Sequence, residues 1–154
     1  MRILKLNFDL KNLLPITLFS LILTVSAFAD DIGNLSANPY SPDSTSNPYG
    51  KGSPFAPDSV NNPYGRYGSP YSDESATNPY ATNPPKLYDQ EGNYRGELSA
   101  NPYAPDSTSN PYGRYGSEFS PDSVNNPYGA GSPYDAGSPT NPYGEGWEIV
   151  GEDE

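Results

Sequence analysis

Apolar residues form one continuous run near the start of the chain and no regular pattern after it. The run covers residues 13–25, follows three basic residues, and is separated from Asp30 by a short segment ending in Ala27-Phe28-Ala29. A basic start, a short apolar segment and small residues before a cleavage point are typical of a secretory signal peptide. The alternatives are a signal anchor and a buried helix, but a spanning helix needs about 20 apolar residues. The pattern therefore predicts a signal peptide over 1–29, recognised at Ala27 and Ala29 and cleaved before Asp30.

From residue 30 onward, the sequence shows neither helical periodicity nor the alternation of a half-buried strand. This part contains 18 Pro and 15 Gly among 125 residues, whereas Leu, Ile, Val and Phe together number only 10. Chains so poor in large apolar residues do not form a conventional buried core. We therefore expect no helix outside the signal peptide.

Short motifs recur throughout this region. Asn-Pro-Tyr begins at 38, 47, 62, 78, 101, 110, 126 and 141, with Ser-Pro-Phe at 53, Ser-Pro-Tyr at 69 and 132, and Ser-Glu-Phe at 117 between them. The period is 15 to 16 residues, and a longer repeat of about 63 residues relates block 1 (35–80) to block 2 (98–143). One block was therefore duplicated, and the two copies flank a different segment, 81–97.

Each repeat carries turn chemistry. In Asn-Pro-Tyr-Gly at 47–50, 62–65, 110–113, 126–129 and 141–144, Asn, Pro and Gly occupy the positions that a type I turn prefers. The Asn side chain can also accept a hydrogen bond from the backbone N–H two residues on. Pro-Asp elements at 41–44, 56–59, 104–107 and 120–123 predict further turns.

The segments outside the two blocks are predicted differently. Residues 81–97 comprise a Pro-rich link and a short β-hairpin, which extends over 86–98 around Gly92-Asn93 and needs a packing partner because Gly96 weakens it. Residues 30–34 are predicted as a linker and 144–154 as an acidic tail. The lone Trp147 in that tail is either an anchor on a partner or a stranded aromatic, and its charged neighbours favour the stranded aromatic.

The fourteen tyrosines are the feature that opposes disorder. Stacked repeats would place Tyr49, Tyr64 and Tyr80 in one ladder, with Tyr112, Tyr128 and Tyr143 in another. Ordering so long a chain costs far more conformational entropy than the burial of these side chains returns. The uneven steps between repeats also disfavour a strict stack. We therefore predict mostly disordered, irregular tandem turn repeats rather than an ordered solenoid.

Composition also limits the chemistry. The chain has no His and no Cys, which removes the usual base of a nucleophilic triad and the commonest metal ligands. The aspartates at 43, 58, 106 and 122 come singly rather than several to a loop, as Ca²⁺ sites require, and Gly65–Gly68 lacks the context of a phosphate loop. We expect no catalytic residue, cofactor or metal site, and therefore no enzyme.

Two functions remain open. After cleavage the chain has 18 acidic and 5 basic residues, which argues against nucleic acid or an anionic membrane as a partner. The first function is a flexible spacer or filler of the cell envelope. The second is a multivalent binding strip for an envelope glycan or protein, formed by Tyr49, Tyr64, Tyr80, Tyr112, Tyr128 and Tyr143. The predicted location is the periplasm or the cell exterior.

The segments 62–71, 87–96 and 120–129 resemble small, uncharacterised exported bacterial proteins built of the same turn repeats. The resemblance covers most of residues 35–144. It implies an envelope or secreted setting and brings no activity, cofactor or catalytic residue. The chain departs from the pattern at Glu118, which replaces Pro, and at Asp73-Glu74, where Pro-Asp is expected. These departures suggest that any single turn is dispensable.

Overall fold

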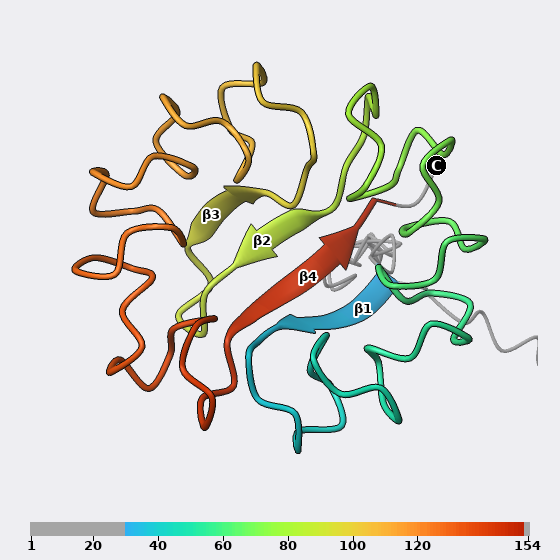
Figure 1. Ribbon diagram of the computed structural model, residues 1–154, viewed down its shortest axis with the longest axis horizontal. Helices are drawn as coiled ribbons and strands as arrows, with labels where there is room; N and C mark the ends of the chain where they lie inside the picture. Colours follow the sequence, from blue (N-terminus) through green and yellow to red (C-terminus); the bar gives the residue numbers. More distant parts are fainter. Residues whose placement is uncertain (1–29, 153–154) are drawn as a thin grey trace, which may run out of the picture.

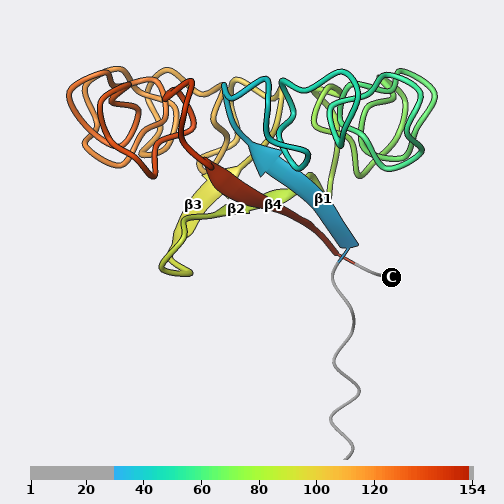
Figure 2. The same cartoon turned by 90° about the horizontal axis from the view of Figure 1, so that it is seen from below.

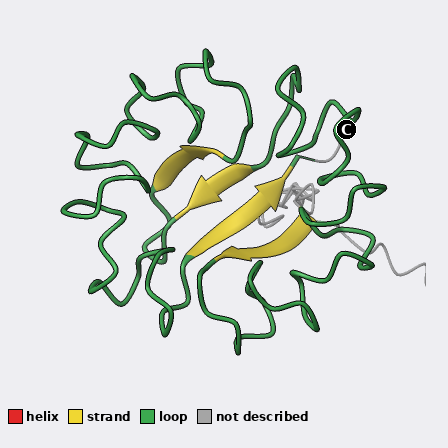
Figure 3. Ribbon diagram, viewed as in Figure 1, coloured by secondary structure: helices red, strands yellow, loops and turns green. Residues whose placement is uncertain are grey.

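The computed structural model describes residues 30–152, which form a small antiparallel sheet surrounded by turns (Figure 1; Figure 3). Its strands are β1 (Asp30–Leu35), β2 (Lys86–Tyr88), β3 (Tyr94–Glu97) and β4 (Trp147–Gly151), in the order β1-β4-β2-β3. The described residues contain no helix, as predicted. The signal peptide predicted over 1–29 lies outside the described residues.

The sheet joins the two ends of the described chain. β1 pairs with β4, so that Asp30 lies opposite Gly151, and β2 occupies the centre between β4 and β3. Seen face on, the turns form a ring around the sheet (Figure 1), and the view from the side shows that this ring of turns lies on one side of the sheet (Figure 2). The predicted hairpin is confirmed, because β2 and β3 pair around a turn in which Gly92 has φ +81°. Its packing partner is β4.

The two halves of the chain interlock. Residues 30–88 begin with β1 and end with β2, whereas residues 94–151 begin with β3 and end with β4, so each half contributes one edge strand and one central strand. The first turn of each half closes the open side of its edge strand with two backbone hydrogen bonds, at positions 63 residues apart. These bonds join Asn34 to Asp43 and Thr45 in the first half, and Glu97 to Asp106 and Thr108 in the second.

The repeats form a chain of consecutive turns. In most of them an N–H donates to the carbonyl three residues earlier, and the acceptor of one turn is often the donor of the turn before it. All five Asn-Pro-Tyr-Gly segments contain this bond, from Gly50, Gly65, Gly113, Gly129 and Gly144 to their respective Asn residues, at 3.0–3.2 Å. The four Pro-Asp elements close in the same way. The predicted turns are therefore present, and they share their ends.

The Asn of each Asn-Pro-Tyr-Gly segment uses both ends of its side-chain amide. The Oδ1 of Asn62 accepts the N–H of Tyr64 at 3.0 Å, as the sequence predicts, while its Nδ2 donates to the carbonyl of Ala56 at 2.9 Å. The same pair of bonds recurs at the other Asn-Pro-Tyr-Gly segments. One side chain thus shapes its own turn and ties it to the turn six residues before.

Serine, not a large apolar residue, fills the interior of the ring. Six serines, each three residues before a repeat Asn, have at most 1% of their surface exposed: Ser44, Ser59, Ser75, Ser107, Ser123 and Ser138. Each hydroxyl accepts the N–H two residues on, at 3.0–3.4 Å. No buried side-chain nitrogen or oxygen in residues 30–152 lacks a partner. Hydrogen bonding, which offsets the desolvation of polar groups, therefore takes the place of apolar packing here.

A small apolar core fixes the ring to the sheet. It comprises Ile32, Leu87, Trp147 and Ile149 from three neighbouring strands, together with Tyr67 from the ring. Tyr67 reaches the core because the step between its flanking motifs is seven residues rather than six. Tyr115 occupies the same extra position in the second half and is also buried. The uneven steps therefore mark residues that turn inward.

Several expectations need correction. The repeats of residues 30–152 follow one defined path of shared turns instead of the mostly disordered path we predicted, because polar groups buried in hydrogen bonds supply cohesion that a count of apolar residues misses. Residues 30–34, expected as a linker, lie in β1, and the tail beginning at 144 contains β4. Trp147 is not stranded, since only 3% of its surface is exposed.

We predict that Ser107→Ala lowers the free energy of unfolding by about 1–3 kcal/mol, the cost of a buried polar group left unpaired. The Ser107 hydroxyl donates to the carbonyl of Ser99 and accepts the N–H of Ser109, both at 3.0 Å. Urea denaturation measures the loss. Ser53→Ala is the matched control, because the half-buried Ser53 hydroxyl accepts a single 3.3 Å bond from Phe55. Equal losses in the two variants would contradict a serine interior.

Candidate functional site

Twelve large aromatic side chains project into solvent from the ring of turns that surrounds the sheet. Their exposed fractions are 84–98%, so almost none of their surface contacts the protein. They are Tyr40, Tyr49, Phe55, Tyr64, Tyr71, Tyr80, Tyr103, Tyr112, Phe119, Tyr128, Tyr134 and Tyr143, and we call this set the aromatic ring. Six belong to each half of the molecule.

The main chain under each of these side chains is fixed. All twelve backbone N–H groups lie two residues after an Asn or Ser, and the Asn or Ser side chain accepts a hydrogen bond from them, at 2.9–3.4 Å. In eleven cases Pro comes directly before the aromatic residue and restricts the turn further. Ordered turns therefore hold the backbone of the aromatic residues in defined places, while their side chains stay exposed to solvent.

The six tyrosines predicted as a binding strip all belong to the aromatic ring. They do not stack: the aromatic pairs within residues 30–152 are Tyr88–Tyr94 and Tyr94–Tyr115, which lie at the hairpin. The prediction omitted the other six members. In the sequence, each of these six is the aromatic third residue of a turn motif. It is Tyr in the motifs that begin at Asn38 and Asn101, and Tyr or Phe in the four Ser-Pro or Ser-Glu motifs.

This arrangement inverts the usual distribution of side chains. Serine and asparagine fill the interior, whereas twelve tyrosine and phenylalanine rings face water. Burial of one such ring contributes roughly 1.5–3 kcal/mol, and this fold forgoes that contribution twelve times. Contiguous exposed apolar patches are typical of interaction sites, and here exposed aromatic side chains recur at twelve separate turns.

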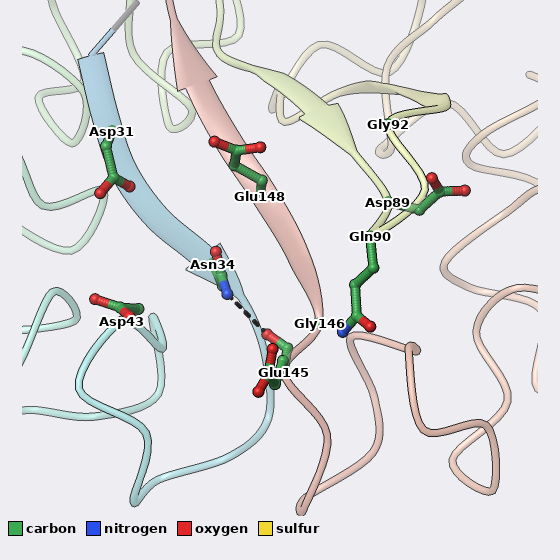
Figure 4. Close-up of a pocket in the computed structure, with 9 residues that line it drawn as sticks. All are labelled: Asp31, Asn34, Asp43, Asp89, Gln90, Gly92, Glu145, Gly146 and Glu148. Atoms are coloured by element: carbon green, nitrogen blue, oxygen red, sulfur yellow. Dashed lines mark hydrogen bonds between the residues drawn. The ribbon is translucent and has the colours of Figure 1, made fainter.

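A second feature is an acidic groove at one end of the sheet (Figure 4). Its volume is about 470 Å³, and it is lined by Asp31, Asn34, Asp43, Asp89, Gln90, Gly92, Glu145, Gly146 and Glu148. Asn34 donates from Nδ2 to the carbonyl of Glu145 at 3.1 Å. Figure 4 shows the carboxylates distributed around the hollow and not converging on one point. Among residues 30–152, no group of three His, Cys, Asp or Glu side chains is arranged to hold a metal ion.

The hairpin turn beside this groove is held by one carboxylate. Burial opposes the ionisation of Asp89, but hydrogen bonds from Asn93 and Arg95 outweigh it and lower the pKa of Asp89. Arg95 lies 2.7 Å from Asp89 and also stacks over the Trp147 ring. Asp89 is therefore a structural group, engaged with its own turn and with the core.

The other candidate acidic residues also have structural or exposed positions. Of the four aspartates considered as Ca²⁺ ligands, Asp122 forms ion pairs with Arg95 and Arg114, and Asp43 and Asp106 accept the edge-strand hydrogen bonds through their backbone carbonyls. Asp58 is exposed. The structure does not bring these four residues into one site, and their contacts are those of turn and edge residues.

The pKa of Glu97 is shifted in the opposite direction to that of Asp89. Burial, together with the charge of Asp106, raises its pKa. A group whose pKa is higher in the folded state contributes stability below its unfolded pKa of about 4.3, and this contribution is lost as the pH rises through the folded pKa. Ionised Glu97 therefore destabilises the fold at neutral pH.

We predict that Glu97→Gln raises the melting temperature at pH 7 and that this gain is smaller at pH 4, which lies below the unfolded pKa of about 4.3. Thermal unfolding followed by circular dichroism at the two pH values measures it. Glu91→Gln removes the same charge from an exposed position in the hairpin turn, so it controls for net charge. A gain in Glu97→Gln that is equally large at both pH values would show that the effect is not ionisation.

Within residues 30–152, no helix has the length and apolar character needed to cross a membrane. No protein family, no curated protein sequence and no solved structure gives a match to this chain.

Proposed function

We propose that the chain is an exported, non-catalytic binding module that holds an extended partner through many weak aromatic contacts. The observation that carries the proposal is the aromatic ring: twelve side chains, each 84–98% exposed, on turns whose backbone is fixed by hydrogen bonds. Fixed turns lower the entropic cost of binding, because the partner meets aromatic groups whose backbone is already in place.

Repetition multiplies weak contacts. A single exposed tyrosine binds a sugar face or a Pro-rich or aromatic segment only weakly, but linked contacts act at high effective concentration and raise the overall affinity by orders of magnitude. A partner that is itself repetitive and extended fits this display. Envelope polysaccharide and extended protein segments are the two candidate classes. The net charge of −13 after removal of the leader disfavours nucleic acid and anionic lipid surfaces.

A flexible spacer is the other function, and the first of the two that the composition suggests. Side-chain hydrogen bonds that close the repeats weigh against it: Thr77 Oγ1 donates to the carbonyl of Gly68 at 2.7 Å, and Thr140 Oγ1 donates to that of Gly131 at 2.6 Å. A spacer also has no need for twelve exposed aromatic side chains at regularly recurring turns. Export rests on the signal peptide predicted over 1–29, and N-terminal sequencing of the exported protein is expected to begin at Asp30.

The test compares binding of the exported protein and two variants to insoluble cell-envelope material. One variant carries Ser at the six aromatic ring positions of the first half, and the other carries Ser at all twelve. We expect the first to bind at least tenfold more weakly, because avidity is lost faster than in proportion to contact number, and the second not to bind.

The replaced side chains are exposed, so both variants should keep the circular dichroism spectrum and melting temperature of the parent. Envelope material treated with protease or with glycan-degrading enzymes identifies which class of partner is retained. Unchanged binding by the variant with all twelve replacements would falsify the proposal.

A further inference from the structure

One groove between neighbouring repeats differs from the rest of the aromatic ring. It has a volume of about 430 Å³, and its lining includes the two exposed rings of Tyr112 and Phe119, with Pro111 and Glu118. Glu118 comes directly before Phe119, whereas Pro comes directly before each of the other eleven members of the aromatic ring. Among the twelve exposed aromatic residues, Phe119 is therefore the one that a carboxylate directly precedes in the sequence.

The amide and serine donors that line this groove already form hydrogen bonds within the protein. The side-chain amide of Asn125 already donates to the carbonyls of Thr108 and Gly116, both at 2.9 Å, and the hydroxyl of Ser109 donates to the carbonyl of Ser99 at 2.6 Å. The Glu118 carboxylate and the faces of two aromatic rings remain for a ligand. These groups favour a cation and offer little to an anion.

The chain cannot supply that cation from its own described residues. Lys51, Arg66, Lys86, Arg95 and Arg114, which are all its basic residues after position 30, each form an ion pair with an aspartate or a glutamate other than Glu118. Arg114 lies close in sequence, but it pairs with Asp122 and stacks over the ring of Tyr115. The complementary charge must therefore come from another molecule.

We propose that this groove binds a lysine or arginine side chain of a basic partner polypeptide, between Tyr112 and Phe119 and against Glu118. The inference rests on the proposed function, since it assigns a partner class to part of the aromatic ring. The rings supply cation–π contacts and the carboxylate supplies an ion pair. The net charge of −13 in the predicted exported chain attracts a basic segment and raises its association rate.

The experiment titrates pentalysine into the isotope-labelled exported protein and follows amide shifts by NMR. We expect shifts confined to residues 109–125. Glu118→Pro restores the residue found in the other repeats, and Glu118→Gln keeps the side-chain shape. Both are expected to weaken binding about fivefold, and added salt should weaken binding more in the parent than in either variant.

A matched gain-of-site variant comes from the chain itself. Residues 62–71 differ from 110–119 only in having Pro70 for Glu118 and Tyr71 for Phe119. Pro70→Glu is therefore expected to create a second pentalysine site at residues 62–71. Absence of binding, equal binding by Glu118→Pro, or shifts spread evenly over the acidic surface would overturn the proposal. Envelope binding that depends on the aromatic ring but not on Glu118 would leave the proposed function intact and remove this inference.

Discussion

Gly96→Ala is expected to lower the free energy of unfolding by about 3 kcal/mol or more, through backbone strain and overpacking together. Gly96 lies in β3 with φ +92°, a conformation that side chains rarely adopt. A Cβ at this position would lie 2.6 Å from the carbonyl oxygen of Asp106 and 2.6 Å from the ring of Tyr115. The first turn of the second half could then no longer close against its edge strand. Urea denaturation measures the loss.

Gly92→Ala is the control for this prediction. Gly92 has a similar φ of +81°, but nothing lies within 4 Å of the place that an alanine methyl group would take. It should therefore lose only the backbone contribution, about 1 kcal/mol. Gly33 is the counterpart of Gly96 in the first half, with φ +107° and the same close approach to a turn carbonyl, so Gly33→Ala should resemble Gly96→Ala. A loss at Gly96 no larger than at Gly92 would refute the close-packing explanation.

The expectation that Gly96 weakens the hairpin considers the two strands in isolation, and the structure adds a contact at Gly96 that sequence alone does not reveal. In isolation, glycine in a strand costs entropy and adds no packing. In the structure, the absence of a side chain at Gly96 lets the turn that contains Asp106 approach the edge strand. There Glu97 donates its N–H to the carbonyl of Asp106 at 2.8 Å. The benefit depends on a segment about ten residues away in sequence.

Local features of the fold could be predicted from sequence. The Asn-Pro-Tyr-Gly turns, the Asn side-chain acceptor and the hairpin around Gly92 all depend on a few adjacent residues whose preferences are strong. The candidate tyrosines were found for the same reason, since each follows Pro at the tip of a turn. Their exposure also follows from that position.

Non-local features could not be predicted in this way. Pairing of β1 with β4 joins residues more than a hundred positions apart, such as Leu35 and Trp147, and the short sequences of these strands carry no signal for each other. The serine interior was missed because serine is usually exposed. An estimate that credits only apolar burial omits the hydrogen bonds of Ser75 with Tyr67 and Thr77, and so it predicts disorder.

The uneven repeat step shows how one signal can support opposite conclusions. In the sequence, the extra residue is an irregularity that disfavours stacking. The structure instead places Tyr67, at one such position, in the core, where its hydroxyl donates to Asp30 at 2.7 Å. Burial and this hydrogen bond raise the pKa of Tyr67. An insertion that recurs in both halves with the same Gly-Arg-Tyr-Gly sequence was the available clue.

Trp147→Ala is expected to lower the free energy of unfolding by about 3–5 kcal/mol, which is typical for truncation of a buried tryptophan. Trp147 lies at the start of β4 opposite Leu35, packs with Ile32 and Ile149, and has the guanidinium of Arg95 5.5 Å from its ring centre. Its loss opens a cavity where the strands of the two halves meet. Thermal unfolding followed by circular dichroism measures the effect, because the variant has no tryptophan fluorescence.

Tyr49→Ala removes a single tyrosine side chain that is 98% exposed. This change should alter the free energy of unfolding by no more than about 0.5 kcal/mol. The contrast separates the two roles of aromatic residues in this chain: those at turn tips are available to a partner, and those at the sheet hold the halves together. Acrylamide quenching of the parent protein adds an independent measurement, since buried Trp147 should be protected until the protein unfolds. Free access of acrylamide to Trp147 in the native protein, or equal stability losses in the two variants, would show that the sheet does not join the two halves as described.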